Sequence, residues 1–251
     1  QGLLNIEMKA RSNLFTWSGQ FSPQFIEALL NHYAKKGSIV LDPFVGSGTV
    51  LCEAGRKNLQ ALGAEINPSA YIIARTYQFI NEHPERRKTS IDSLDRLLIS
   101  NLPILQPSED VIKRSIIEIH TNIESSITKM LLESLITLVD FHKPNLTLDK
   151  LFATWTKLID TLLSLPYSSK PIQVKNCDAR KMPWSDNTID LVVTSPPYIN
   201  VFNYHQQYRE SMEALGWNLL SVAKSEIGSN RKHRGNRFLT VIQYCLDIAQ
   251  T

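Results

Sequence analysis

A glycine-containing turn between a short buried strand and a helix is the feature that most constrains the fold of this chain. Residues 38–44 (SIVLDPF) form a β-branched run that ends in Asp-Pro, and residues 45–49 (VGSGT) lead into helical spacing over residues 50–58. A second strand-like run (QALGAEI, 60–66) and a helical stretch from Pro68 to about residue 80 follow. Parallel strands need a crossover helix between them, and this alternation supplies one. The sequence therefore predicts a doubly wound, Rossmann-like α/β sheet.

A strand pattern of the same kind returns nearer the other end of the sequence. Residues 172–178 (IQVKNCD) and 189–198 (IDLVVTSPPY) each carry a β-branched apolar run that ends in a polar or proline-bearing cluster. Such clusters are typical of the carboxyl edge of a doubly wound sheet. We expect two more strands here, four in all. Helical sequence around residues 204–222, a polar basic loop over 224–237 and a last amphipathic stretch over 238–249 are expected to follow.

The intervening segment, residues 81–170, shows no strand pattern. It begins polar (NEHPERRKTS) and then gives two helical stretches, over residues 109–142 and 148–165. We interpret it as a helical insertion. One α/β domain is then expected from residues 1–80 and 171–251, with four strands.

Composition limits the class of protein only loosely. The chain has 251 residues and a formal net charge of +3 at pH 7, which permits a nucleic-acid partner without requiring one. Cys52, Cys177 and Cys245 lie far apart with no CxxC pair, so we expect neither a disulfide framework nor a metal site. The apolar stretch at residues 130–139 is interrupted by polar residues well short of the roughly 20 residues that a membrane span needs. We expect a protein of the reducing cytoplasm without membrane contact.

The first motif that carries chemistry is DPFVGSGT, residues 42–49. Gly46 and Gly48 let the backbone approach a ligand closely. Asp42 disfavours an anion, the P-loop lysine is absent, and the third residue after Gly48 is Leu51 where a dinucleotide-binding fingerprint needs glycine. A ligand with a cationic amino group and an adenosine fits better. S-adenosylmethionine has both.

Two further acidic residues follow strand-like runs. Glu65 ends the second run, where a carboxylate can accept hydrogen bonds from both ribose hydroxyls. Asp178 ends the third run, where it can accept from the exocyclic amine of adenine. With Asp42, these residues predict a cofactor site along one edge of the sheet.

The second motif is TSPPY, residues 194–198, at the end of the fourth strand-like run. Two consecutive prolines hold the backbone rigid and deny it ladder pairing. The Ser195 oxygen and the Pro196 carbonyl can accept the two hydrogens of an exocyclic base amine, whose nitrogen then becomes more tetrahedral and more nucleophilic. Tyr198 can stack on the base. Positioning of the methyl donor in line on the other side would then supply much of the rate.

Together, DPFVGSGT and TSPPY resemble the motifs of the DNA amino-methyltransferases, S-adenosylmethionine-dependent enzymes that modify cytosine N4 or adenine N6. The resemblance covers residues 15–80 and 172–204 and implies a methyltransferase sheet. Within that family, LFTWSGQFSP resembles the segment that closes over the methionine end of the cofactor, which implies contacts from Thr16 and Trp17. Serine as the first letter of SPPY is more typical of cytosine-N4 enzymes, including those of restriction-modification systems.

The motifs and the resemblance give the following candidate residues. Those expected to bind the cofactor are Thr16, Trp17, Asp42, Phe44, Gly46, Ser47, Gly48, Thr49, Glu65, Ile66, Asp178, Ala179 and Thr194. Those expected to hold the target base are Ser195, Pro196, Pro197 and Tyr198.

DNA is the expected partner. A base must leave the duplex stack to reach such a pocket, so base flipping is expected, with residues 200–209 lining the entrance. The basic loop that follows can neutralise DNA phosphates. Its cationic residues are Lys224, Arg231, Lys232, Arg234 and Arg237.

Two alternatives and one structural expectation remain open. The chain could act on an RNA base, as guanine-N2 enzymes do, although these usually carry Asn-Pro-Pro-Tyr and an added RNA-binding domain. It could also be a cofactor-binding subunit without activity of its own. The family fold has seven strands against the four expected here, and an open parallel edge is an aggregation hazard. We therefore expect a fragment or one half of a split enzyme, completed by a second polypeptide or a second copy.

Overall fold

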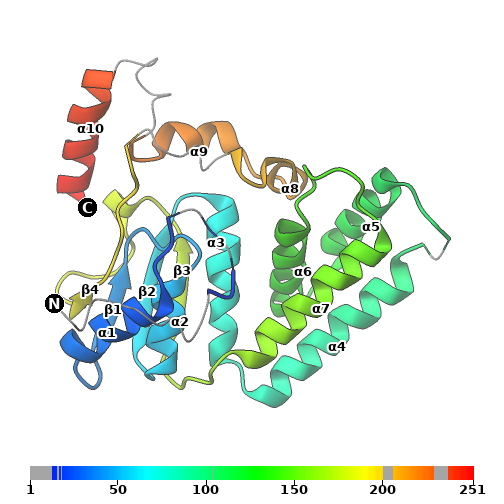
Figure 1. The fold of residues 1–251 in the computed structure, drawn as a ribbon, viewed down its shortest axis with the longest axis horizontal. Helices are drawn as coiled ribbons and strands as arrows, with labels where there is room; N and C mark the ends of the chain where they lie inside the picture. The colour runs from blue at the N-terminus through cyan, green and yellow to red at the C-terminus, as the bar shows by residue number, and fades with distance from the viewer. Residues whose placement is uncertain (1–12, 16, 18, 104, 200–205, 229–236) are drawn as a thin grey trace.

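The computed structural model describes residues 13–15, 17, 19–103, 105–199, 206–228 and 237–251. Its centre is one parallel sheet of four strands in the order β3-β2-β1-β4 (Figure 1). The strands are β1 (Ile39–Asp42), β2 (Gln60–Glu65), β3 (Ile172–Asn176) and β4 (Leu191–Val192). The predicted α/β architecture, with a four-stranded parallel sheet of Rossmann-like type, is confirmed.

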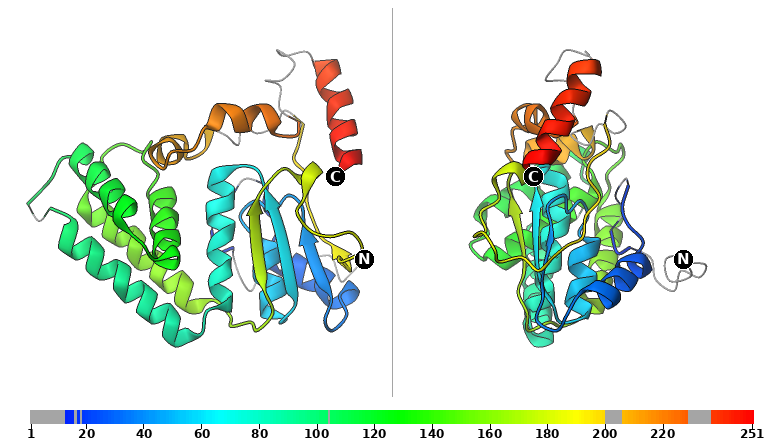
Figure 2. Two further views of the ribbon diagram at one scale, coloured as in Figure 1. Left: turned by 180° about the vertical axis from the view of Figure 1, so that it is seen from behind. Right: turned by 90° about the vertical axis from the view of Figure 1, so that its left-hand side faces the viewer.

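The two faces of the sheet are covered differently. Val40 pairs with Ala61 on one side and Leu191 on the other. These residues face α1 (Pro23–Tyr33) and α2 (Thr49–Arg56), which lie together on one face of the sheet (Figure 2). The connection from β3 to β4 must cross the sheet from one edge to the other, and it does so on the opposite face.

Local sequence explains where the first helices begin. Ser22 caps α1 by accepting a hydrogen bond from the backbone N–H of Phe25, and a proline occupies the first turn, as predicted. Asn67 caps α3 (Pro68–Arg75) in the same way, accepting from the N–H groups of Ser69 and Ala70. α3 continues as the 3₁₀ helix η1 (Thr76–Asn81), which ends the helical stretch that we expected to reach residue 80.

The segment between η1 and β3 holds four helices, where the sequence predicted two helical stretches. They are α4 (Pro84–Asn101), α5 (Glu109–Asn122), α6 (Ser126–Val139) and α7 (Leu148–Ser164). α4 was missed because its composition is polar, although Ile91, Leu94 and Leu98 recur at helical spacing and are buried. The stretch expected over 109–142 is divided where Ser125 caps a new helix.

These four helices share one apolar core with the sheet and its helices. Arg87 of α4 is 2% exposed, and its guanidinium donates to the carbonyls of Ile80, Leu165 and Pro166. A buried guanidinium is tolerated only where its donors are satisfied. Arg87 thereby joins the start of α4 to the end of α7, at the point where the chain leaves and re-enters the sheet.

In the described part of the chain after TSPPY, three helices lie along the top of the molecule as Figure 1 shows it. They are α8 (Arg209–Ala214), α9 (Leu219–Ser225) and α10 (Arg237–Gln250), with α8 beside α6 and α10 at the opposite end. The helical sequence expected over residues 204–222 forms two short helices in its described part, because Gly216 adopts a φ of +85° between α8 and α9 and ends the first of them. α10 turns polar side chains inward, with Thr240 and Asp247 buried, while Phe238 and Leu246 are 74% and 60% exposed.

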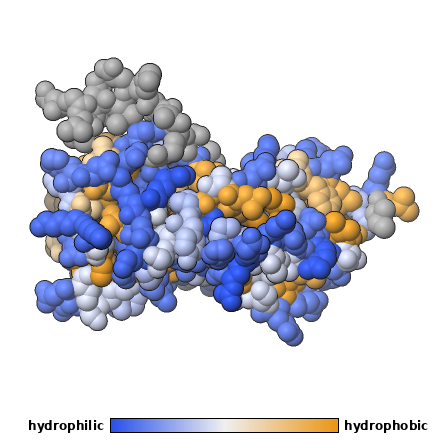
Figure 3. All heavy atoms as spheres, turned by 90° about the horizontal axis from the view of Figure 1, so that it is seen from below, coloured by the Kyte–Doolittle hydropathy of each residue, from blue (hydrophilic) through white to orange (hydrophobic). Residues whose placement is uncertain are grey.

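The surface is mixed in polarity. Seen from below, it is chiefly hydrophilic, with an apolar patch near the middle of the long axis (Figure 3). Cys52, Cys177 and Cys245 are free thiols. Within the described ranges, no helix combines the length and apolarity needed to cross a membrane.

Candidate active site

The structure brings the two motifs into direct contact. β1 and β4 are adjacent and parallel, so DPFVGSGT and TSPPY leave the sheet at the same edge. The hydroxyl of Thr194 donates a 2.6 Å hydrogen bond to Oδ1 of Asp42, across 152 positions of sequence. One carboxylate therefore fixes the spacing between the glycine turn and the proline turn.

Asp42 is almost fully enclosed, with 3% of its surface exposed. Its Oδ1 atom also accepts from the backbone N–H of Phe44 at 3.1 Å. Burial raises the pKa of Asp42 to about 7, although the hydrogen bonds from Thr194 and Phe44 act in the opposite direction. A ligand that carries positive charge would stabilise the ionised form of this carboxylate.

Glu65 connects the glycine turn to the end of β2. Its two carboxylate oxygens accept from the backbone N–H groups of Gly46 (2.9 Å) and Asn67 (2.8 Å). Burial is the main cause that raises the pKa of Glu65 to about 8; these two hydrogen bonds lower it, and the charges of Glu226 and Asp42 raise it further. Glu226 approaches from the end of α9, where it accepts from the side-chain amide of Asn67 at 3.2 Å.

The glycine turn requires its glycines for two separate reasons. Gly46 and Gly48 have φ values of +51° and +89°, in the region that L-residues rarely adopt. At Gly48 an added Cβ would also lie 2.5 Å from a ring carbon of Tyr77 and 3.2 Å from the backbone of Ala74. Since Tyr77 is 2% exposed, its ring has little room to move away.

Replacing Gly48 with alanine is therefore expected to lower the free energy of unfolding by about 3 kcal/mol, the sum of backbone strain and overpacking. Gly37→Ala is the matched control, because Gly37 has a φ of +91° and an added Cβ there meets nothing within 4 Å. Urea unfolding of both variants separates strain from the clash. Equal losses in the two variants would contradict the tight contact at Gly48.

The segment before α1 lies over the glycine turn. The side-chain amide of Gln20 donates to the Ser47 hydroxyl and to the carbonyl of Phe15, both at 2.8 Å. Trp17 lies beside Gly46, where an added Cβ would be 3.3 Å from the indole. The Thr49 hydroxyl donates to Asn13 at 2.9 Å. These contacts place Trp17 next to the turn, as the closing segment of the expected site requires.

Asp178 lies at the carboxyl end of β3, and its carboxylate is bound by Arg180. The backbone N–H and Nε of Arg180 each donate to Oδ1 at 2.9 Å, and Nη2 donates to Oδ2. Burial raises the pKa of Asp178, but the hydrogen bonds and charge of Arg180 outweigh it and hold the pKa below its ordinary value. Asp178 is thus ionised at neutral pH.

The TSPPY turn is partly open to solvent. Tyr198 is 50% exposed, and the backbone at residues 198–199 lies beside Gly228, where an added Cβ would be 3.4 Å from the Tyr198 carbonyl oxygen. An exposed aromatic ring next to a rigid turn is a suitable platform for a planar base. Its role, like that of the other candidate residues, stays a prediction.

The described candidates for the cofactor and the base lie at or beside the carboxyl ends of β1, β2, β3 and β4. Some candidates fall outside the described residues: Thr16, Arg231, Lys232 and Arg234, as does most of the expected entrance at 200–209. Arg237 begins α10, and its side chain is not among those described. Lys224 lies in α9 rather than in a loop.

Sequence analysis missed four residues of this edge: Gln20, Asn67, Arg180 and Glu226. Asn67 could have been found, because an asparagine directly before a proline is a helix-start signal after a strand. Arg180 reaches Asp247 of α10, 67 positions away, besides its neighbour Asp178, and Glu226 contacts Asn67, 159 positions away. No local pattern predicts such partners.

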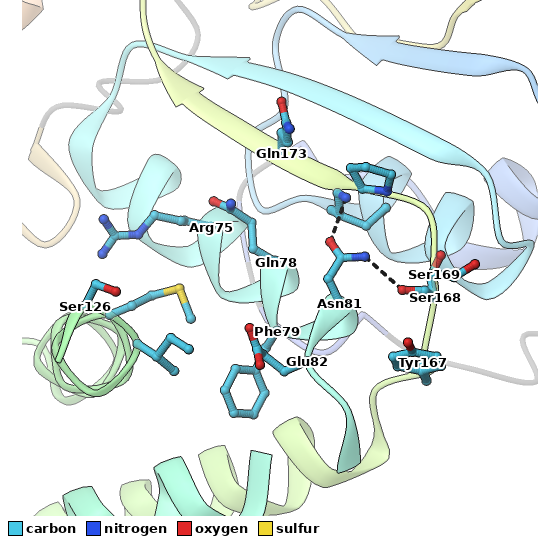
Figure 4. A pocket seen from close by; sticks show the side chains of 14 residues that line it. Arg75, Gln78, Phe79, Asn81, Glu82, Ser126, Tyr167, Ser168, Ser169 and Gln173 are labelled. Carbon is cyan, nitrogen blue, oxygen red and sulfur yellow. Dashed lines mark hydrogen bonds between the residues drawn. The ribbon is translucent and has the colours of Figure 1, made fainter. Parts of the chain in front are cut away.

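A cavity of about 590 Å³ lies elsewhere, at the start of β3 between η1 and α6 (Figure 4). Among its lining residues, Asn81 donates to the carbonyl of Ser168 at 2.9 Å and accepts from the N–H of Ile172 at 2.8 Å. This side chain holds the start of β3 in place. None of the candidate residues lines the cavity, so we place the site at the carboxyl edge.

Comparison with known proteins gives a consistent result. Residues 4–76 match the family described as DNA methylase. Over 86 residues the chain is 30% identical to Type II methyltransferase M.MjaII of Methanocaldococcus jannaschii, covering 34% of this chain and 15% of that protein. Over 272 residues it is 23% identical to Type II methyltransferase M.BsoBI of Geobacillus stearothermophilus, covering 81% and 52%. The chain thus spans about half the length of the second relative and less of the first.

Proposed function

We propose that this chain is the catalytic part of a DNA amino-methyltransferase that uses S-adenosylmethionine and acts on cytosine N4 in preference to adenine N6. The observation that carries the proposal is the hydrogen bond from Thr194 to Asp42. It holds the glycine turn, which is expected to bind the cofactor, beside the proline turn, which is expected to hold the base amine. The match to the DNA methylase family and the likeness to two Type II methyltransferases support it. In this proposal residues 81–170 are an insertion in the catalytic domain.

The residues of the carboxyl edge fit S-adenosylmethionine. Burial raises the pKa of Asp42 to about 7 and that of Glu65 to about 8, so both carboxylates would be stabilised by positive charge or by donated hydrogen bonds. The ligand offers a sulfonium, an ammonium and two ribose hydroxyls. Asp178 is ionised and at the next strand end, where the adenine amine would be expected. Trp17 would cover the methionine end beside Gly46.

On the base side, the chain supplies orientation rather than a strong base. When bound, S-adenosylmethionine supplies an electrophilic methyl group. Ser195 Oγ and the Pro196 carbonyl would accept the two hydrogens of the exocyclic amine, which localises its lone pair on nitrogen. Tyr198 would stack on the flipped ring. Serine at position 195 favours cytosine over adenine, through the resemblance of SPPY to cytosine-N4 enzymes.

The test is incubation of the protein with methyl-tritiated S-adenosylmethionine and duplex DNA, followed by digestion and identification of the labelled nucleoside. Label on N4-methyl-2′-deoxycytidine is expected. Label on adenine would overturn the base preference, and label that appears only with RNA would overturn the substrate class. Binding of the cofactor without transfer to any nucleic acid would show a non-catalytic subunit instead.

We also propose that a further polypeptide segment covers the β4 edge and the outer face of α10. Val192 at that edge is 54% exposed, and the outward side chains of α10 are large and apolar. Among the described residues, β4 pairs only with β1, and monomeric proteins rarely leave such apolar surface together with an open strand edge. Light scattering at micromolar concentration tests whether the covering segment is a second copy. A monomer whose α10 exchanges its amide hydrogens as slowly as the buried strands do would show that this chain alone protects the helix, and would contradict the proposal.

A further inference from the structure

Arg180 occupies a position that the proposed chemistry does not use. It follows the end of β3 in the 3₁₀ helix η2 (Ala179–Lys181), and its guanidinium reaches three elements. Besides the Asp178 carboxylate, it donates to Asp247 of α10 at 2.7 Å and to the carbonyl of Ser225 at the end of α9 at 3.1 Å. Its side chain is 14% exposed.

The acceptor positions of Asp178 are nearly filled by this one residue. An ionised carboxylate offers about four lone-pair positions. Arg180 takes two on Oδ1 and one on Oδ2. Among the contacts of the described residues, one position on Oδ2 is left. A carboxylate held in this way presents a single acceptor in a fixed direction.

Asp247 keeps Arg180 from rotating away. It is 5% exposed, and its Oδ1 atom also accepts from Gln243 of the same helix at 2.8 Å. Burying this carboxylate is costly unless a cation pairs with it. Arg180 is that cation, so the docking of α10 and the orientation of Asp178 depend on the same guanidinium.

We propose that Arg180 is a positioning residue of the cofactor site, which orients the Asp178 carboxylate so that its remaining acceptor selects a ligand carrying an exocyclic amine on the purine. This proposal rests on the proposed function. Arg180 acts through Asp178 and through its anchor on α10.

The experiment compares the affinities of two ligands by calorimetry: S-adenosylhomocysteine and its analogue with hydrogen in place of the purine 6-amino group. A hydrogen bond to a charged acceptor predicts that the unmodified protein prefers the amine by about 10- to 100-fold. In Arg180→Gln the preference is expected to fall to about threefold or less. Lys181→Gln, which removes the same charge one residue along, is expected to keep it. A purely structural role would weaken both ligands equally and leave the ratio unchanged.

The outcomes separate the two proposals. If neither ligand binds the unmodified protein, the proposed function fails. If both bind but Arg180→Gln keeps the preference, or the unmodified protein shows none, the role of Arg180 is overturned. Should Arg180→Gln fail to fold, as judged by circular dichroism, Arg180→Lys replaces it. Lysine cannot donate in a fork, so a preference at least threefold below that of the unmodified protein is expected, and an unchanged one would overturn the proposal.

Discussion

Replacing Ser195 with alanine is expected to lower the rate of methyl transfer by about 100-fold while leaving the affinity for S-adenosylmethionine within about twofold. Ser195 follows Thr194, whose hydroxyl is bonded to Asp42, so the backbone of the turn keeps its anchor in the variant. Only the acceptor for the base amine is lost. The measurement is single-turnover transfer of tritiated methyl groups to DNA, with cofactor affinity determined separately by calorimetry.

Ser185→Ala is the matched control for that experiment. Ser185 is exposed in the connection between β3 and β4, and its carbonyl, which accepts from Thr188, is unaffected by the change. This variant is expected to behave as the unmodified protein. A normal rate in Ser195→Ala, or a collapse of its cofactor affinity, would show that the roles assigned to the two turns are wrong.

The affinity for S-adenosylmethionine is expected to rise by about 10- to 100-fold between pH 6 and pH 8. The pKa values of Asp42 and Glu65, raised by burial to about 7 and about 8, mean that the protein without ligand holds protons on both groups at pH 6. A cationic ligand that also donates hydrogen bonds favours the ionised carboxylates, so its binding releases protons. Each released proton raises the affinity by as much as about tenfold per pH unit.

Calorimetry in two buffers of different ionisation enthalpy counts the released protons directly. S-adenosylhomocysteine lacks the sulfonium, so its affinity is expected to change less with pH. Binding of S-adenosylmethionine to the Asp42→Asn variant should release one proton fewer. The stability of the unliganded protein depends on pH in the opposite direction to its ligand affinity. The pKa values of Asp42 and Glu65 in the folded protein lie above their values in the unfolded chain, so the stability that these groups contribute is lost as pH rises through about 7 to 8. An affinity that does not change across this pH range would contradict the acidic cofactor site.

The sheet was predictable because its signals are local. The apolar run that ends at Asp42, the glycines after it and the cap before Pro23 each specify conformation within a few residues. α4 was missed because its composition is polar, and the burial of Arg87 within it depends on the end of α7, more than 60 residues later. The helical sequence around residues 204–222 does not show by its spacing that α8 and α9 are separate, because their division depends on the φ of +85° at Gly216.

The candidate site was likewise predictable only where its signals are local. Asp42, Glu65 and Asp178 could be named because each follows a strand, and strand ends meet at one edge in a parallel sheet. Sequence gave no sign that Glu65 accepts from the turn itself, through the N–H of Gly46, or that Arg180 binds Asp178 to α10. These contacts join residues whose proximity exists only after folding.

The most direct test of the proposed cofactor site at the carboxyl edge of the sheet is a crystal structure with S-adenosylhomocysteine bound. We expect the ligand to lie along the carboxyl ends of β1 and β2, in contact with Asp42 and Glu65, with its sulfur facing the turn at Pro196. A ligand bound in the cavity beside Asn81, or one that leaves Pro196 on the far side of the molecule from its sulfur, would contradict the proposed function.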